Sequence, residues 1–252
     1  MKNHFILTPY FLDQPIPGLE PLLEADWVKN DPRLPHGSPQ SRMGVLYEPL
    51  AELVAMAVNQ GERPVSIAGD CCTSLGVLAG LQRANLNPIL IWFDAHGDFN
   101  TWETTPSGFL GGMPLAMLVG RGEQTIVESL GLMPIPESRV ILSDGRDLDP
   151  GEREALANSQ VVHLPGVMDL LDYDLPEVPI WVHFDTDVID ARIAPAMNYP
   201  VSGGPDETQL QSVFNRLAQT GSVAAISMSS WNPELDEDGR SRFVSMKLLG
   251  EL

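Results

Sequence analysis

The chain has 252 residues, and its 15 Lys and Arg residues against 34 Asp and Glu residues give a formal net charge of −19. This charge excludes a nucleic-acid partner and an anionic membrane surface, because both require surplus cationic side chains, and it fits a small cationic or zwitterionic ligand. Hydrophobic residues make up 43% of the chain, which is enough for a core, yet no apolar run approaches the roughly 18 residues that a membrane span needs.

Near the N-terminus, Pro9, Asp13 and Pro15 soon interrupt a short apolar stretch at residues 5–7. That pattern is not a secretory signal, so we expect a cytoplasmic protein. No linker, internal repeat or change of composition divides the chain. We therefore expect a single domain over residues 1–252.

Five short apolar runs follow in chain order, and each is continuous rather than alternating, as is typical of strands in a parallel sheet that is buried on both faces. These runs span residues 65–68, 88–93, 139–142, 180–184 and 223–228. Apolar residues at helical spacing predict helices at 50–58, 73–84 and 210–217, and the last of these follows Pro205-Asp206-Glu207, a sequence typical of a helix N-terminus. Strands that alternate with helices predict an α/β domain with a doubly wound, parallel sheet.

Chemically active side chains stand directly after three of these runs, where ligands bind in sheets of this type. The three segments are Gly69-Asp70-Cys71-Cys72, Asp94-Ala95-His96-Gly97-Asp98 and Asp185-Thr186-Asp187-Val188-Ile189-Asp190. A spacing of two residues places Asp94, His96 and Asp98 on one side of an extended backbone, and the same holds for Asp185 and Asp187. So many neighbouring carboxylates cannot all ionise unless a cation binds between them.

Divalent metal ions resolve this conflict. Ligation by several oxygens and one imidazole suits Mn²⁺, and carboxylates bridge two ions ~3.5–4 Å apart. The alternative for each single Asp is a helix N-cap or a turn residue after a strand, but the set as a whole favours a metal site. The neighbouring Cys71 and Cys72 exclude a disulfide framework, which leaves one thiol as a core residue or a metal ligand.

The patterns Asp94-Ala-His96-x-Asp98 and Phe184-Asp185-x-Asp187-x-x-Asp190 resemble the two signature motifs of the arginase-like ureohydrolases, which are binuclear manganese enzymes. The segment Ala68-Gly69-Asp70-Cys71 is similar to the Gly-Gly-Asp-His motif of that family. The resemblance implies a three-layer α/β/α fold whose parallel, doubly wound sheet has about eight strands. It also implies two Mn²⁺ ions per chain and a small guanidino amino acid as the partner.

By position, the resemblance implies two bridging carboxylates and two further ligands for each ion. These ligands are Asp94 and Asp185 as the bridges, Cys71 and Asp98 on one ion, and His96 and Asp187 on the other. A hydroxide held between the ions would attack the guanidinium carbon, and Asp98 would relay its proton to the leaving amine.

The same resemblance assigns the residues that bind the amino-acid end of the substrate. Asn100 and Ser107 match positions that hold the α-carboxylate. Asp149 matches the position that recognises the α-ammonium, and Glu152 lies nearby in the same motif. A substrate with both groups intact is therefore expected, which disfavours agmatine.

Four positions depart from the family pattern. Cys71 replaces the leading histidine ligand, and Gly111-Gly112 replaces a His-Gly pair that supplies the acid/base histidine. Ser230 stands at the position of the glutamate that anchors the guanidinium group, and Phe109 stands where arginases usually have Asn. The amino-acid end of the pocket is thus kept, whereas the guanidinium end is altered.

A sequence that lacks this histidine and has Cys in place of a histidine ligand resembles the N-omega-hydroxy-L-arginine amidinohydrolase type. That type is associated with biosynthesis of the antibiotic cycloserine. The expected reaction converts N-omega-hydroxy-L-arginine and water to L-ornithine and hydroxyurea, because a hydroxyguanidine is less basic than a guanidine and its carbon is easier to attack. Two alternatives stay open: another ureohydrolase of the arginase or formiminoglutamase type, and a metal-binding pseudoenzyme.

His183 lies two residues before Asp185 and so shares its strand face. It is a candidate for the missing proton relay, and a buried structural histidine is the alternative. The chain ends at Leu252, shortly after the last motif, so a monomer is expected while the oligomeric state stays open.

Overall fold

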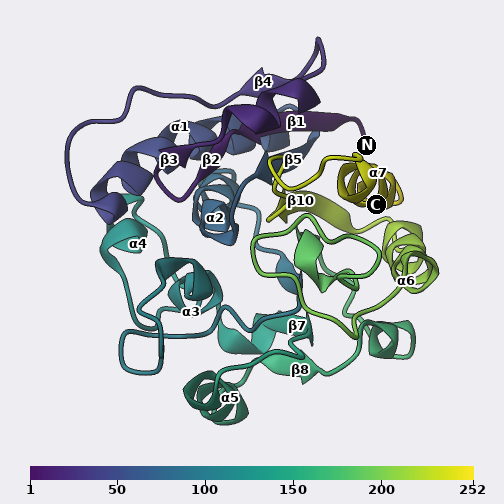
Figure 1. The fold of residues 1–252 in the computed structure, drawn as a ribbon. Coiled ribbons are helices and arrows are strands. Elements are labelled where there is room, and N and C mark those ends of the chain that lie inside the picture. Colours follow the sequence, from purple (N-terminus) through teal and green to yellow (C-terminus); the bar gives the residue numbers. More distant parts are fainter.

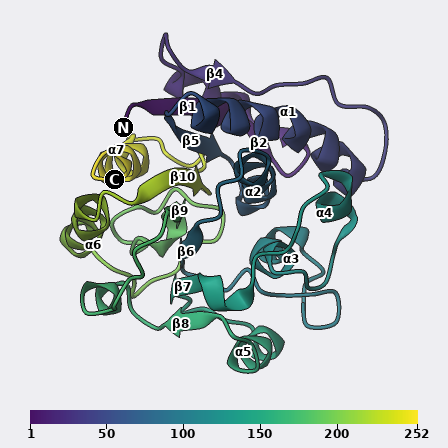
Figure 2. The ribbon, with the colours of Figure 1, turned by 180° about the vertical axis from the view of Figure 1, so that it is seen from behind.

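Eight parallel strands form one sheet in the computed structural model, which describes residues 1–252. Figure 1 shows the fold, and the strand order in the sheet is β4-β1-β5-β10-β9-β6-β7-β8. The last two strands of the chain, β9 and β10, therefore lie in the middle of the sheet, where Figure 2 labels both. In chain order the strands are β1 (Asn3–Thr8), β4 (Val28–Lys29), β5 (Arg63–Ala68), β6 (Ile89–Asp94), β7 (Val140–Asp144), β8 (Val162–Leu164), β9 (Ile180–Asp185) and β10 (Val223–Ser229). A separate antiparallel pair, β2 (Tyr10–Phe11) and β3 (Gln14–Pro15), follows β1.

The five strands that the apolar runs predict are confirmed as β5, β6, β7, β9 and β10. Three further strands, β1, β4 and β8, were not predicted, because none of them contains a long apolar run. β1 pairs with β5 along its whole length, from Asn3 opposite Arg63 to Thr8 opposite Ala68.

Seven α-helices accompany the sheet: α1 (Pro39–Asn59), α2 (Ser74–Arg83), α3 (Pro114–Leu118), α4 (Thr125–Ser129), α5 (Pro150–Ala157), α6 (Glu207–Gln219) and α7 (Arg240–Leu249). α1 begins at Pro39 rather than at residue 50, because Ser38 caps it and a proline is well placed at the first helical position. Asp206 and Gln209 form a capping box at the start of α6, where Pro205-Asp206-Glu207 predicts a helix N-terminus.

The sheet separates two cores, and alternate residues of β6, β7 and β9 belong to one or the other. Leu90 and Trp92 of β6 belong to a cluster of 37 buried residues that includes α1 to α4. Ile91 and Phe93 belong to a second cluster of 31 buried residues with α6 and α7. Figure 2 shows α1, α2 and α3 on one side of the sheet and α6 and α7 on the other. The predicted three-layer α/β/α fold with a parallel sheet is therefore confirmed.

The strand order decides where the chemistry collects. β10 and β9 fill the space between β5 and β6, so four neighbouring strands end at the same edge of the sheet. The segments after β5, β6, β9 and β10 consequently meet there, although they are far apart in the sequence. None of the helices is both long enough and apolar enough to cross a membrane.

Candidate metal centre

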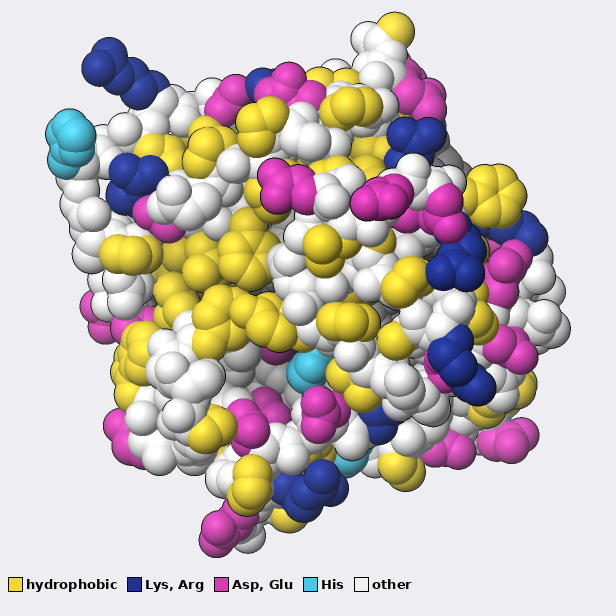
Figure 3. All heavy atoms as spheres, in the orientation of Figure 1, with side chains coloured by type: hydrophobic (Ala, Val, Ile, Leu, Met, Phe, Trp, Pro, Cys, Tyr) yellow, Lys and Arg dark blue, Asp and Glu magenta, His cyan; other side chains and the backbone are white.

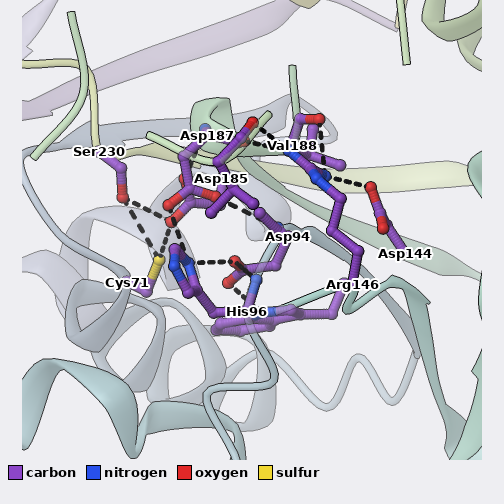
Figure 4. Close-up of polar contacts among 12 residues, drawn as sticks. Cys71, Asp94, His96, Asp144, Arg146, Asp185, Asp187, Val188 and Ser230 are labelled. Atoms are coloured by element: carbon purple, nitrogen blue, oxygen red, sulfur yellow. Dashed lines mark hydrogen bonds and ion pairs between the residues drawn. The ribbon is translucent and has the colours of Figure 1, made fainter. Parts of the chain in front are cut away.

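The six side chains predicted as metal ligands follow three strand ends, and Figure 4 labels five of them, all except Asp98. Asp94 is the last residue of β6, Asp185 is the last residue of β9, and Cys71 begins a short 3-10 helix directly after β5. The other three predicted ligands lie in the turns that follow β6 and β9. All four aspartates and the cysteine are buried, and the histidine is partly exposed.

The donor atoms form overlapping groups in which every atom lies within 4.8 Å of the others. Two of these groups are Cys71 with Asp94 and Asp98, and Asp94 with His96 and Asp187. A third joins Cys71 to Asp185 and His183. Asp94 belongs to both of the first two groups, as a carboxylate that bridges two ions must.

The turn-capping alternative is also correct for the two strand-end aspartates. Oδ1 of Asp94 accepts a hydrogen bond from the backbone N–H of His96 at 2.7 Å, and Oδ1 of Asp185 accepts one from the backbone N–H of Asp187 at 2.8 Å. A carboxylate has room for further partners, so capping and metal ligation are compatible. The cap in fact orients each carboxylate toward the cluster.

Asp98 provides the test of whether the cluster fits a metal. It is buried, its backbone φ is +50°, and its Oδ2 atom has no hydrogen-bond partner. Burial, together with repulsion from Asp94 and Asp185, raises the pKa of Asp98 well above its usual range. Burial and the neighbouring Asp187 and Asp94 likewise raise the pKa of Asp185. Cations between these oxygens would remove the penalty, so the donor set fits divalent metal ions.

Cys71 is turned into the same cluster. Its Sγ atom lies 2.6 Å from Oδ2 of Asp185 and 3.0 Å from Oγ of Ser229. Burial and the surrounding carboxylates raise the pKa of the thiol well above its usual value, so without cations it donates to Asp185 as a neutral group. A bound metal ion would reverse this preference and favour the thiolate.

A pocket of about 220 Å³ opens above the cluster. In Figure 3 it is visible as a hollow in which acidic side chains and a histidine are exposed, bordered by hydrophobic side chains. Its lining includes several Asp and Glu residues and no Lys or Arg. All five residues predicted to bind substrate line it, namely Asn100, Ser107, Asp149, Glu152 and Ser230.

Three of these five residues form one connected unit. Nδ2 of Asn100 donates to Oδ2 of Asp149 at 3.0 Å, and Asp149 and Glu152 form the capping box of α5. Oε1 of Glu152 also accepts from the backbone N–H of Phe99 at 2.7 Å. Glu152 therefore ties the segment that follows β6 to α5, and this places Asn100 beside Asp149.

The other two predicted substrate residues lie at different depths of the pocket, one at its rim and one near the metal cluster. Ser107 is exposed, and its hydroxyl accepts from the backbone N–H of Phe109 at 3.2 Å. Ser230 follows β10 with a φ of +74°, and its hydroxyl donates to Oδ2 of Asp185 at 2.5 Å. The deep end of the pocket thus has a hydroxyl bonded to a predicted metal ligand where the family has a glutamate.

His183 lies behind the cluster and does not line the pocket. Its Nδ1 atom is 2.8 Å from Oγ of Ser227, and its ring stacks on Trp92 with the centroids 3.6 Å apart. Burial lowers the pKa of His183 to about 3, which leaves the ring neutral. This placement weighs against a proton relay to substrate and agrees with the alternative of a buried structural histidine.

Arg146 was not among the predicted site residues, yet it holds the ligand-bearing turn (Figure 4). Its guanidinium pairs with Asp144 at the end of β7. It also donates to the main-chain oxygens of Asp187 and Val188, both at 3.1 Å, and of Val201 at 2.9 Å. Because β6 lies between β7 and β9, Arg146 crosses the end of β6. In the sequence, the sign of this role was an arginine two residues after Asp144, the acidic residue that ends β7.

The family model described as "Arginase family" matches residues 30–252. The chain belongs to the arginase family. It is 30% identical over 217 residues to an arginase of Bacillus subtilis and 32% identical over 218 residues to an arginase of Bacillus caldovelox; both alignments cover 81% of this chain and 73% of the relative. The solved arginase of Bacillus caldovelox matches 100% of this chain and 97% of its own length, with a TM-score of 0.82 and 25% identity. A formimidoylglutamase of Bacillus subtilis shares the fold, with a TM-score of 0.74 at 16% identity.

Membership makes the protein an arginase-family amidinohydrolase, an enzyme that hydrolyses carbon–nitrogen bonds in linear amidines. Enzymes of this family are typically binuclear manganese hydrolases, and the structure contains groups of Asp, His and Cys side chains that could hold metal ions. The family and the arginase-like sheet expected from the sequence motifs are both confirmed.

Proposed function

We propose that this protein is a binuclear manganese amidinohydrolase that converts N-omega-hydroxy-L-arginine and water to L-ornithine and hydroxyurea. The observation that carries the proposal is the contrast between the two ends of the pocket. The amino-acid end has Asn100 and Asp149 in mutual contact, with Ser107 at the rim. Toward the metal cluster, Gly111 and Ser230 stand where the family pattern has an acid/base histidine and an anchoring glutamate, so neither of these two positions supplies an imidazole or a carboxylate.

The six ligands proposed for two Mn²⁺ ions are Cys71, Asp94, His96, Asp98, Asp185 and Asp187. When bound, the two ions would activate water as a nucleophile at neutral pH. Asp94 belongs to the group with Cys71 and Asp98 and to the group with His96 and Asp187, which supports a bridging role for it. For Asp185 the bridging role is supported by the resemblance of its segment to the family motif. Cys71 contributes a thiolate where the family has a neutral imidazole, and this reduces the positive charge of the centre by one.

The chain's own residues then orient the substrate and move protons. Asn100 and Ser107 donate hydrogen bonds to the α-carboxylate, and Asp149 accepts from the α-ammonium. The free Oδ2 atom of Asp98 accepts a proton from the attacking water and passes it to the departing amine. The bond that breaks joins the guanidine carbon to the δ-nitrogen, so the water oxygen remains in hydroxyurea and the nitrogen leaves as the amine of ornithine.

A hydroxyguanidine suits the altered end of the pocket for a chemical reason. The electron-withdrawing oxygen lowers the basicity of the group, so it reaches the centre as a neutral species more readily than a guanidinium does. A neutral group has less need of an anchoring carboxylate, and its carbon is more open to attack. Ser230 and Gly111 together therefore favour the hydroxylated substrate over L-arginine.

The deciding experiment measures ornithine release by the Mn-loaded protein from N-omega-hydroxy-L-arginine and from L-arginine side by side, with the metal content determined on the same sample. We expect two Mn per chain and a kcat/KM for the hydroxylated substrate at least about 100-fold above that for arginine, equivalent to roughly 2.7 kcal/mol of transition-state stabilisation. Faster turnover of arginine would identify an arginase instead. Two bound ions with no release from either substrate would reject both amino acids.

A further inference from the structure

The pocket has one apolar wall. Its aromatic lining consists of Phe11, Phe109 and Tyr199, and every other lining side chain except Cys71 is polar, charged or absent. The ring centroids of Phe11 and Phe109 are 6.2 Å apart, and those of Phe109 and Tyr199 are 5.4 Å apart. Three segments that are distant in the sequence therefore build one aromatic surface, with Phe109 in the middle.

Gly111 makes room for this wall. A Cβ atom placed on Gly111 would overlap Cζ and Cε1 of the Phe109 ring, so the ring occupies the space that a side chain at position 111 would need. Backbone strain is not the reason for this glycine, because Gly111 does not have a positive φ. The neighbouring Gly112 differs: a Cβ there meets nothing closer than Nδ2 of Asn100 at 4.0 Å.

We infer that Phe109, in the space that Gly111 leaves free, is a specificity-determining residue whose ring packs against the methylene chain of a linear amino-acid substrate. The inference rests on the proposed function for the amino-acid nature of the substrate. The amino and carboxylate groups have polar partners at the rim, and the reacting group lies over the metal cluster. The aliphatic part between them needs an apolar surface, and Phe109 stands at the centre of the only aromatic one.

The expected effect is on binding and not on the chemical step. Phe109 has no titratable group with which to move protons, and a methylene chain is packed equally in the ground state and in the transition state. Phe109→Ala should therefore raise KM roughly 5- to 20-fold and leave kcat within about twofold. The metal content should stay at the wild-type level.

A binding measurement tests the inference without turnover. Calorimetric titration of the Mn-loaded protein with L-ornithine, which carries three methylenes, should give a Kd that rises roughly 5- to 20-fold in Phe109→Ala. An unchanged Kd, or no ornithine binding by the wild-type protein, would overturn the inference. If ornithine binds as expected but N-omega-hydroxy-L-arginine is not turned over, the proposed function fails while the packing role of Phe109 stands.

A double mutant tests whether the Phe109 ring and a side chain at position 111 would occupy the same space. Gly111→Ala should lower the melting temperature by roughly 2–6 °C and raise the ornithine Kd, because the methyl group displaces the ring. In a Phe109→Ala background the same substitution should change neither quantity. Gly112→Ala is the matched control and should be close to neutral in both backgrounds. Equal effects of Gly111→Ala and Gly112→Ala on melting temperature and Kd would contradict the idea that the ring occupies the space of a side chain at position 111. An effect of Gly111→Ala that persists in the Phe109→Ala background would contradict it as well.

Discussion

Asp94 and Asp185, which end β6 and β9, each combine a turn-capping role with a proposed role as a metal ligand. Asp94 uses Oδ1 to cap the turn that carries His96, and Asp185 uses Oδ1 to cap the turn that carries Asp187. The cap fixes the direction of the carboxylate and also the position of the next ligand. Local backbone geometry and the proposed metal ligation are thus coupled at the level of a single residue.

This coupling gives a first prediction. Asp94→Asn or Asp185→Asn keeps a capping oxygen but removes the charge that balances the cations, so metal loading should fall below two ions per chain and turnover should drop on the order of 1,000-fold. Metal content by elemental analysis, together with ornithine release, checks this. Asp238→Asn, on an exposed loop, is the control and should match the wild type. Full activity in either centre variant would refute the ligand assignment.

Cys71 gives a second prediction at the same scale. Cys71→His should retain two metal ions, because imidazole is a suitable ligand for Mn²⁺ at this position, whereas Cys71→Ala should lose one ion for want of a donor. Elemental analysis after dialysis at a fixed Mn²⁺ concentration separates the two variants. Equal metal content in Cys71→Ala and the wild type would show that the thiol is not a ligand.

At the scale of secondary-structure elements, the centre depends on how the loops after β7 and β9 are held together. Arg146 reaches from the loop after β7, past the end of β6, to the main-chain oxygens of Asp187 and Val188. A planar guanidinium can bond Asp144 and three carbonyl oxygens at once, which an ammonium group cannot reproduce. Arg146 therefore positions the ligand turn without touching the pocket.

Arg146→Lys should accordingly weaken metal binding although it keeps the charge. We expect the Mn²⁺ concentration for half-loading to rise about tenfold, in line with the usual effect of losing a group that orients a metal ligand. Equilibrium dialysis against graded Mn²⁺ concentrations measures this shift. Arg153→Lys on the exposed face of α5 is the matched control. A Lys variant with unaltered loading would assign Arg146 a role in general stability alone.

At the scale of the whole molecule, ionisable groups outside the proposed ligand set link stability to pH. Hydrogen bonds from Arg192 hold the pKa of Asp190 below its ordinary value of 3.8. A carboxylate with a lowered pKa in the folded state stabilises the fold above its unfolded pKa, and that contribution disappears as the pH falls through the folded pKa. Asp190 should therefore contribute at neutral pH and lose its effect in acid.

The corresponding prediction concerns the acid limb of the stability curve. Asp190→Asn should lower the melting temperature at pH near 7 by roughly 2–4 °C, and the difference from the wild type should shrink steadily below a pH of about 4. Calorimetric melting at a series of pH values, with Asp238→Asn as the exposed control, checks this. A difference that stays constant down to low pH would mean that the charge of Asp190 is not the stabilising feature.

Much of the candidate site could be predicted from the sequence, because its ligands come directly after apolar runs at fixed short spacings. Asp94, His96 and Asp98 come from one turn, and Asp185 and Asp187 come from another. Continuous apolar runs indicate buried parallel strands, and the residues just after such strands collect at one edge of the sheet. The resemblance to the family motifs then indicated these residues as candidate ligands. β1 was not predicted, because its apolar stretch at residues 5–7 is only three residues long and Pro9 soon follows it, and because its pairing with β5 is a contact between distant segments.

The sequence by itself therefore determined the fold class, the family and the residues that stand at the strand ends. Only the tertiary structure decided that β10 and β9 lie between β5 and β6, which brings Cys71 to 2.6 Å from Asp185. It also placed His183 behind the cluster and the Phe109 ring over Gly111. The physical reason is that strand patterns record which residues are buried and where a strand ends. The order of strands and the packing of side chains depend on contacts between distant segments, which leave no periodic signal in the chain.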